Sequence, residues 1–186
     1  TNINSYQLFS SGEDNYLIFH LQNSPSAAVL AWANTTIGSY PTRRVIVTTH
    51  DYMSGTTRTT AGEAIWNGFI RHHADQVFLV LSGHSIGEAQ ITDTVDGHNV
   101  YQLLANYQDR PNGGNGWLRT LSFHPAEDKI YIKTYSPYLK SYETDSNSQF
   151  TLNYDTNYAS SPPQLIGTIT NVPSGGVASL PWPGRL

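Results

Sequence analysis

The sequence predicts an α/β fold in which buried parallel strands alternate with helices and an antiparallel sheet follows. Two apolar runs, residues 45–47 and 77–81, lack the polar alternation of a half-exposed strand. Such continuous runs are typical of strands covered on both faces. The second half of the chain instead contains short strand-like segments separated by turn-forming residues, which favours antiparallel hairpins.

The first half begins with a predicted short strand over residues 16–21, followed by a helix. Ser24 and Pro25 suit the N-cap and the first helical position. Apolar side chains follow at four-residue spacing, at Val29, Ala33 and Ile37. Gly38 is expected to end the helix.

A second strand is predicted to end at His50, and a second helix follows it. Thr60 and Glu63 have the spacing of a capping box, so the helix is expected to begin there and to finish near residues 72–73. A third strand then covers residues 77–82. This alternation predicts parallel strands joined by crossover helices.

The second half is predicted to form hairpins. Turn-rich spacers cover residues 109–116 and 124–128. The expected strands are residues 99–107, 117–123, 129–135 and 150–154. Residues 160–163, Ser-Ser-Pro-Pro, are typical of a linker. We therefore expect one main domain over residues 1–157, with residues 158–186 forming a linker and the start of a truncated β-sandwich domain.

Composition excludes several classes of function. The 186-residue chain has no cysteine, so disulfides, thiolate metal sites and cysteine nucleophiles are ruled out. Its formal net charge is −4, and only 13% of its residues are charged, which does not favour nucleic-acid binding. No apolar stretch approaches the roughly 20 residues of a membrane span. Low lysine with abundant Thr, Ser, Asn and Tyr favours a secreted or periplasmic protein.

Two histidines directly follow the two predicted buried strands. His50 ends one strand, and His84 follows the other after Gly83. Open α/β sheets keep their binding sites at the carboxyl ends of the strands. Imidazole is a common metal ligand and proton carrier. We therefore expect His50 and His84 to share one site, with metal ligation as its chemistry.

Residues 83–87, Gly-His-Ser-Ile-Gly, also match the G-x-S-x-G motif of α/β-hydrolases. In that interpretation Ser85 is the nucleophile, with Asp93 or Asp96 and His98 or His124 as its partners. The motif must open a long helix, whereas residues 88–95 are rich in threonine and β-branched side chains. Their composition indicates a strand or loop, which argues against a serine hydrolase.

Several blocks of the sequence together resemble the calcineurin-like metallophosphoesterases. They are VIVTTHDYM, VFLVLSGHSIGEA, NVYQLLANYQDRPNGGNGWLR and IYIKTYSPYLKSYETDSNSQFTL. The similarity covers roughly residues 5–156, and the blocks occur in the family's order. It is greatest to large secreted bacterial members that carry extra β-sandwich domains.

The resemblance implies a mixed β-sandwich flanked by helices, with a pair of divalent metal ions (Mn, Fe or Zn) at strand ends. His50 matches the family's late single histidine, and His84 matches the first histidine of its final Gly-His-x-His block. Ile86 replaces the second histidine of that block. The blocks that supply the bridging aspartate and the other ligands are absent. The chain therefore resembles only the C-terminal half of the catalytic domain.

Three expectations follow for function. The parent protein is expected to hydrolyse a phosphoester, while this chain alone binds metal weakly, because two histidines cannot complete two coordination spheres. Because half of the catalytic domain is expected to be missing, the strands that end at His50 and His84 are expected to lack neighbouring strands and to expose an apolar edge. The chain is therefore expected to need another polypeptide or self-association. Alternatively, the chain is a non-catalytic structural or self-assembling module.

Overall fold

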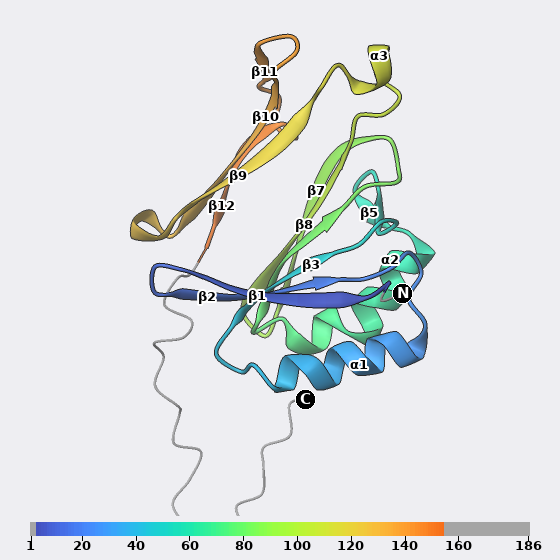
Figure 1. The fold of residues 1–186 in the computed structure, drawn as a ribbon, viewed down its shortest axis with the longest axis vertical. Helices are drawn as coiled ribbons and strands as arrows, with labels where there is room; N and C mark the ends of the chain where they lie inside the picture. Colours follow the sequence, from blue (N-terminus) through green and yellow to red (C-terminus); the bar gives the residue numbers. More distant parts are fainter. Residues whose placement is uncertain (1–2, 155–186) are drawn as a thin grey trace, which may run out of the picture.

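The computed structural model describes residues 3–154 and arranges them in three layers (Figure 1). A six-stranded sheet with strand order β1-β2-β3-β6-β8-β7 lies in the middle. Two helices cover one of its faces and a four-stranded sheet covers the other. The fold is thus mixed α/β and mostly sheet, as the sequence predicts.

The middle sheet contains a parallel core with an antiparallel strand at each edge. Its strands are β1 (Ser5–Ser11), β2 (Asp14–His20), β3 (Arg44–Thr48), β6 (Val77–Ser82), β7 (Gly87–Val95) and β8 (His98–Asn106). Strands β2, β3, β6 and β8 run parallel. Helix α1 (Ala27–Gly38) connects β2 to β3, and α2 (Thr60–Gly68) lies between β3 and β6. The predicted crossover units are therefore confirmed.

Strand β3 shows why its sequence is a continuous apolar run. Val45 and Val47 are fully buried against the helices, whereas Ile46 faces the second sheet. Since both faces of the strand are covered at these three central positions, polar residues occur only at its two ends. Phe78 and Leu79 on β6 likewise pack against Ile130 and its neighbours in the second sheet.

The second sheet is wholly antiparallel and is centred on one strand. Strand β10 (Lys129–Ser136) pairs with β9 (Leu118–His124) on one side and with β11 (Ser141–Glu143) and β12 (Gln149–Asn153) on the other. The remaining short elements are β4 (Met53–Ser54), β5 (Thr57–Arg58), α3 (Pro111–Gly114) and the 3-10 helices η1 (Ile70–His73) and η2 (Pro125–Glu127). The hairpin predicted from residues 117–123 and 129–135 is confirmed.

Both main helices begin next to the predicted positions. The N-cap of α1 is Ser26, whose hydroxyl accepts the Val29 N–H, rather than Ser24. The N-cap of α2 is Thr59, which accepts the N–H of Gly62. The capping box predicted from Thr60 and Glu63 is therefore wrong by one residue. Position 59 is also a threonine, so the sequence offers a second N-cap one residue earlier, and the structure uses that one.

Strand β8 joins the middle sheet instead of the C-terminal hairpins. Asp96 and Gly97 both have positive φ, 50° and 84°, which suits the tight turn of a two-residue hairpin. This turn folds β8 back against β7, and β8 also pairs with β6 as a parallel neighbour.

A second prediction about the sheet is wrong. The strands that lead to His50 and His84 do not lose neighbours: β3 lies between β2 and β6, and β6 lies between β3 and β8. The sheet edges are β1 and β7. Strand β1 was not expected, because every residue in it is exposed and the sequence carries no buried periodicity there.

Residues 158–186, the predicted linker and second domain, lie outside the described residues. Among residues 3–154, none of the helices has the length and apolar character needed to cross a bilayer.

Candidate functional site: a histidine pair at the strand ends

His50 and His84 lie together at the carboxyl end of the parallel strands. Nδ1 of His84 is 3.0 Å from Nε2 of His50, and the ring centroids are 4.8 Å apart. Both side chains are exposed. Neighbouring parallel strands end at one edge of a sheet, so residues just beyond β3 and β6 meet there. The structure therefore brings together the two histidines that the sequence predicted to share a site.

The backbone fixes this pair. The N–H of Gly83 donates to the carbonyl oxygen of His50 at 3.1 Å, which extends the β3–β6 ladder into the loops. The Asn106 amide donates to the His84 carbonyl at 2.7 Å. His84 has φ of 62°, in the left-handed region that few residues other than glycine adopt. Such strain is typical of residues that a functional site positions.

The separation of the two nitrogens fits ligands of one cation. Zn–N distances of about 2.0–2.1 Å and a tetrahedral angle place two ligating nitrogens about 3.3 Å apart. The same nitrogens can also share one proton in a direct hydrogen bond. Two nitrogens at this separation could hold a borderline cation such as Zn²⁺ as two of its ligands.

The rest of a coordination sphere is not supplied nearby. Within residues 3–154, the one group of three acidic or histidine side chains close enough to hold an ion excludes both His50 and His84. Ile86 is 49% exposed and has no ligand atom. The donor set fits part of one site and not a metal pair.

Asp51 lines a pocket of about 460 Å³. The other lining residues come from the starts of α1 and α2 and include Ser24 and Thr59. Oδ1 of Asp51 is buried and has no hydrogen-bond partner among the described residues. Within residues 3–154 no hydrogen bond joins Asp51 to His50, so the structure does not show Asp51 orienting that ring.

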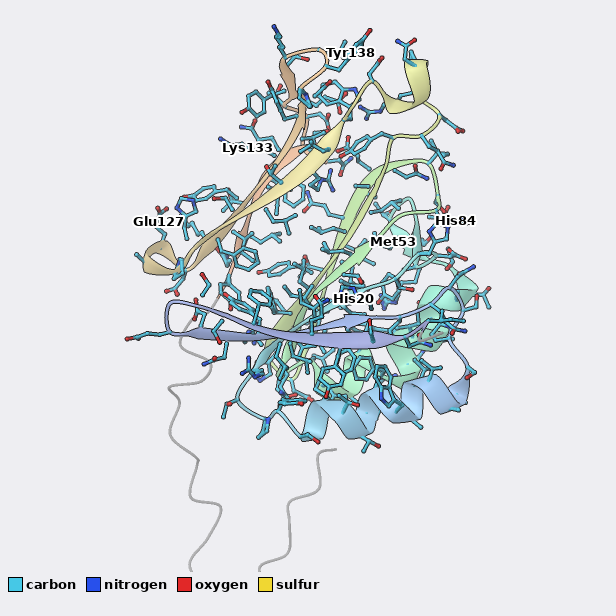
Figure 2. The ribbon with its side chains drawn as sticks, viewed as in Figure 1. His20, Met53, His84, Glu127, Lys133 and Tyr138 are labelled. Atoms are coloured by element: carbon cyan, nitrogen blue, oxygen red, sulfur yellow. The ribbon has the colours of Figure 1, made fainter. Side chains whose placement is uncertain are left out.

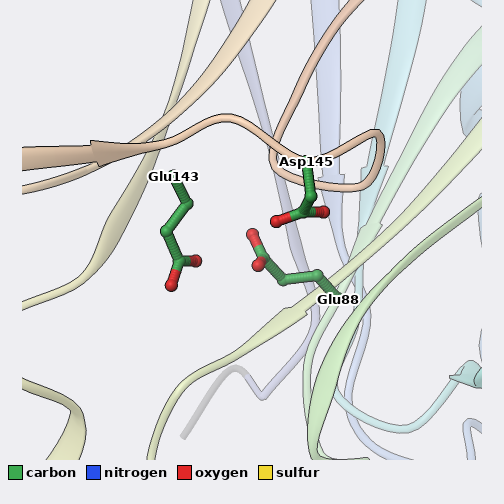
Figure 3. A group of neighbouring side chains, drawn as sticks. All are labelled: Glu88, Glu143 and Asp145. Carbon is green, nitrogen blue, oxygen red and sulfur yellow. The ribbon is translucent and has the colours of Figure 1, made fainter.

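The acidic group close enough to hold an ion consists of Glu88, Glu143 and Asp145, whose carboxylates converge between the two sheets (Figure 3). Sequence reasoning missed this group. Its members are far apart along the chain and share no spacing pattern, so no local signal could have found them.

Glu88 is already saturated by donors from the protein. Its Oε1 accepts the hydroxyls of Tyr107 and Thr134, both at 2.8 Å, as well as the guanidinium of Arg119. Its Oε2 accepts Arg110 at 3.1 Å and Ser148 at 2.7 Å. A cation would have to displace two guanidinium groups. We therefore interpret this cluster as a structural network that joins the two sheets.

The charges around Glu88 determine its ionisation. Burial alone would raise the pKa of this carboxyl, but hydrogen bonds from Ser148, Thr134 and Tyr107 and the charge of Arg119 outweigh burial, so its pKa lies below the ordinary value. Burial raises the pKa of Tyr107 to about 12, which keeps its phenol protonated as a donor. Glu88 is thus an anion at neutral pH.

Ser85 does not have the surroundings of a hydrolase nucleophile. It is followed by β7, where the motif requires a helix. Within residues 3–154 no hydrogen bond links its hydroxyl to a histidine or a carboxylate. Of the proposed partners, Asp93 accepts from Arg58 and Gln102.

The other histidines lie elsewhere. His20 contacts Thr48 at 2.8 Å, His72 contacts the Asn67 carbonyl at 2.8 Å, and His73 contacts Asn34 at 2.7 Å.

No family model matches this chain. A curated relative, "Uncharacterized protein YvnB" of Bacillus subtilis (strain 168), is 34% identical over 165 residues. The match covers 81% of this chain and 13% of the relative, so the chain spans about an eighth of that protein's length.

Proposed function

We propose that this chain is the C-terminal half of a calcineurin-like metallophosphoesterase domain and that its parent protein hydrolyses phosphoesters. The observation that supports this best is the 3.0 Å approach of His84 Nδ1 to His50 Nε2 at the ends of adjacent parallel strands. The similarity to one segment of a much longer protein is consistent with a chain that forms part of a larger unit.

In this proposal His50 and His84 each give a neutral imidazole nitrogen to one divalent cation. Residues outside this chain supply the bridging carboxylates and the second site. The bound metals would provide Lewis acidity toward the phosphoryl oxygens. The chain's own contribution is to hold the two rings at a fixed separation, through the Gly83–His50 backbone bond and the constrained loop at His84.

Substitution of either histidine tests the proposal. His50→Gln and His84→Asn are expected to weaken Zn²⁺ or Mn²⁺ binding to the chain at least about tenfold, because each removes one of two ligands. Asparagine suits position 84 because it tolerates a left-handed backbone. Isothermal titration calorimetry measures the effect. His98→Gln is the matched control, because His98 is an exposed histidine at the opposite end of the parallel strands.

The hydrolytic part of the proposal needs the parent protein. There, the same two variants are expected to lower metal-dependent hydrolysis of nitrophenyl phosphate at least about a hundredfold, while His98→Gln retains it. The 186-residue chain alone is expected to turn over little or nothing. Unchanged hydrolysis in both histidine variants of the parent would overturn the assignment, as would brisk, chelator-sensitive hydrolysis by the isolated chain.

We also propose that the chain associates with another polypeptide or with itself, through the edge strand β1. Leu8 and Phe9 are 42% and 41% exposed on this strand, which pairs with β2 on one side only. Exposed apolar edge strands are templates for pairing. Light scattering at micromolar concentration is expected to give more than the monomer mass, and Leu8→Lys is expected to restore the monomer. A clean monomer for the unmodified chain would contradict self-association.

The alternative of a non-catalytic, self-assembling module rests on the same edge strand. It becomes the better explanation if the chain self-associates and calorimetry detects no binding of either cation. Leu8→Lys would then remove the assembly without any change in metal affinity.

A further inference from the structure

Three side chains on the outer face of the second sheet, Ser122, His124 and Glu127, are joined in a row by hydrogen bonds. Ser122 and His124 are two residues apart on β9, so their side chains lie on the same face of the sheet. Glu127 follows in the 3-10 helix η2. On the neighbouring strand, Tyr131 is directly opposite Ser122 and Lys133 is opposite Thr120. The residues line a pocket of about 380 Å³.

This pocket is separate from the histidine pair. Figure 2 shows Lys133 on the second sheet, Glu127 in the short helix η2 at one end of that sheet, and His84 on the opposite side of the molecule. Any chemistry here is therefore independent of the proposed metal site.

The hydrogen bonds use both nitrogens of the His124 ring. Nε2 of His124 is 3.0 Å from the Ser122 hydroxyl oxygen, and Nδ1 is 3.3 Å from Oε1 of Glu127. This is the order in which serine hydrolases connect nucleophile, base and orienting acid. With Nδ1–H donated to Glu127, Nε2 carries the lone pair and faces the serine hydroxyl.

Tyr131 holds Glu127, the acid of these three side chains, in place. Its hydroxyl donates to Oε2 of Glu127 at 2.5 Å, and its ring meets the His124 ring edge to face, with centroids 4.8 Å apart. This hydrogen bond, together with the one from His124, lowers the pKa of the Glu127 carboxyl. Glu127 is therefore ionised at neutral pH and can hold the Nδ1 proton of His124.

We propose that Ser122 is a nucleophile, activated by His124 and Glu127, that accepts acyl groups from small carboxylic esters. The Ser122 oxygen attacks the ester carbonyl carbon while its proton passes to Nε2 of His124. The carbon–oxygen bond to the alcohol then breaks, and the alcohol leaves with the proton held by His124. Water releases the acyl group by the same steps in reverse order, which regenerates the serine.

The surroundings of Ser122 set the rate. Strand β10 pairs with β9 on one side and with β11 and β12 on the other, so its backbone groups are engaged in ladders and do not form an oxyanion hole. One such donor is worth about 10²–10³ in rate. Slow acylation that is detectable as covalent labelling is therefore expected, instead of rapid turnover. The pocket volume of about 380 Å³ suits a small ester.

A fluorophosphonate probe tests the proposal on the intact 186-residue chain. Attack by Ser122 expels fluoride and leaves a stable adduct, which peptide mass spectrometry locates. Ser122→Ala is expected to reduce labelling to background, and His124→Gln to slow it at least about tenfold. Glu127→Gln, which keeps the shape of the side chain, is expected to slow it as well. Ser122 is exposed, so its replacement leaves the fold intact, as circular dichroism can verify.

Ser85→Ala is the control, since Ser85 directly follows His84 and belongs to the G-x-S-x-G match; it is expected to label like the unmodified chain. Addition of a chelator should also leave labelling unchanged, which separates this activity from the metal site. Absence of labelling in the unmodified chain, or equal labelling of Ser122→Ala, would overturn the proposal.

Discussion

Replacement of Gly62 with alanine is expected to destabilise the fold by about 3 kcal/mol, at the upper end of the cost of overpacking. A Cβ at position 62 would lie 2.0 Å from the carbonyl oxygen of Tyr52 and 2.9 Å from its carbonyl carbon. Both atoms belong to the backbone and cannot rotate away. The clash outweighs the roughly 1 kcal/mol by which alanine favours a helix over glycine.

The effect should extend to the histidine pair, because Tyr52 is two residues from His50. Tyr52 is fully buried, its carbonyl accepts the Thr59 N–H at 3.0 Å, and its hydroxyl donates to Gln102 at 2.8 Å. Relief of the clash requires α2 to move away from this loop. We therefore expect Gly62→Ala to weaken metal binding in addition to lowering stability.

Urea unfolding measures the change in stability, and Gly38→Ala is the matched control. Gly38 is the last residue of α1, and a Cβ there would have nothing within 4 Å. This variant is expected to be neutral or slightly stabilising. Equal stabilities for the two variants would show that the α2–Tyr52 contact is looser than the structure indicates.

The histidine pair could be predicted because it depends on strand ends alone. Val45–Val47 and Val77–Leu81 are recognisable as buried strands from composition, and the carboxyl ends of adjacent parallel strands share one edge. No other tertiary information was needed to bring His50 and His84 together. The 3.0 Å separation, by contrast, depends on the left-handed backbone at His84, which nothing in the sequence predicted.

The order of strands in the middle sheet could not be predicted, because it depends on which strand the β7–β8 hairpin pairs with. The Asp96–Gly97 turn makes β7 and β8 antiparallel partners, but it does not specify that β8 pairs with β6. Strand β1 escaped prediction for a different reason: a fully exposed edge strand has no buried face to create alternation.

The sequence also did not predict the two polar networks, the one around His124 and the one around Glu88. Ser122 and His124 have the spacing of residues on one face of a strand, which is a usable signal. Glu127 reaches His124 only because η2 turns the chain back after β9. Around Glu88 the five donors come from four separate segments, so their convergence results from the packing of the two sheets and not from any local pattern.

That convergence makes Glu88→Gln the second substitution with a large expected effect, a loss of about 4 kcal/mol in unfolding free energy. The Glu88 and Arg119 side chains are both only 6% exposed. A neutral amide leaves the Arg119 charge buried without its anion, and breaking one side of a buried ion pair costs about 3–5 kcal/mol. The amide N–H groups would also face donors such as Tyr107 and Ser148.

Glu63→Gln is the control, because Glu63 forms an ion pair with Arg58 at 3.2 Å but is 50% exposed. Exposed pairs are worth at most about 1 kcal/mol, so this variant should remain close to the unmodified chain. If urea unfolding gave equal losses for the two variants, burial of the Glu88 network would not be the cause of its stabilising effect.

The pH dependence of the unfolding free energy distinguishes the contribution of the Glu88 charge from that of the shape of its side chain. Its pKa is lower in the folded state than the ordinary value of 4.5, so the unfolded chain takes up a proton first as the pH falls. The stabilisation by Glu88 is therefore fully present at neutral pH, begins to decline near pH 4.5, and is lost as the pH passes below the folded-state pKa. The difference in unfolding free energy between the unmodified chain and Glu88→Gln should accordingly shrink from pH 7 toward pH 3. A difference that stayed constant over this range would mean that the amide disrupts packing and that the carboxylate charge contributes little.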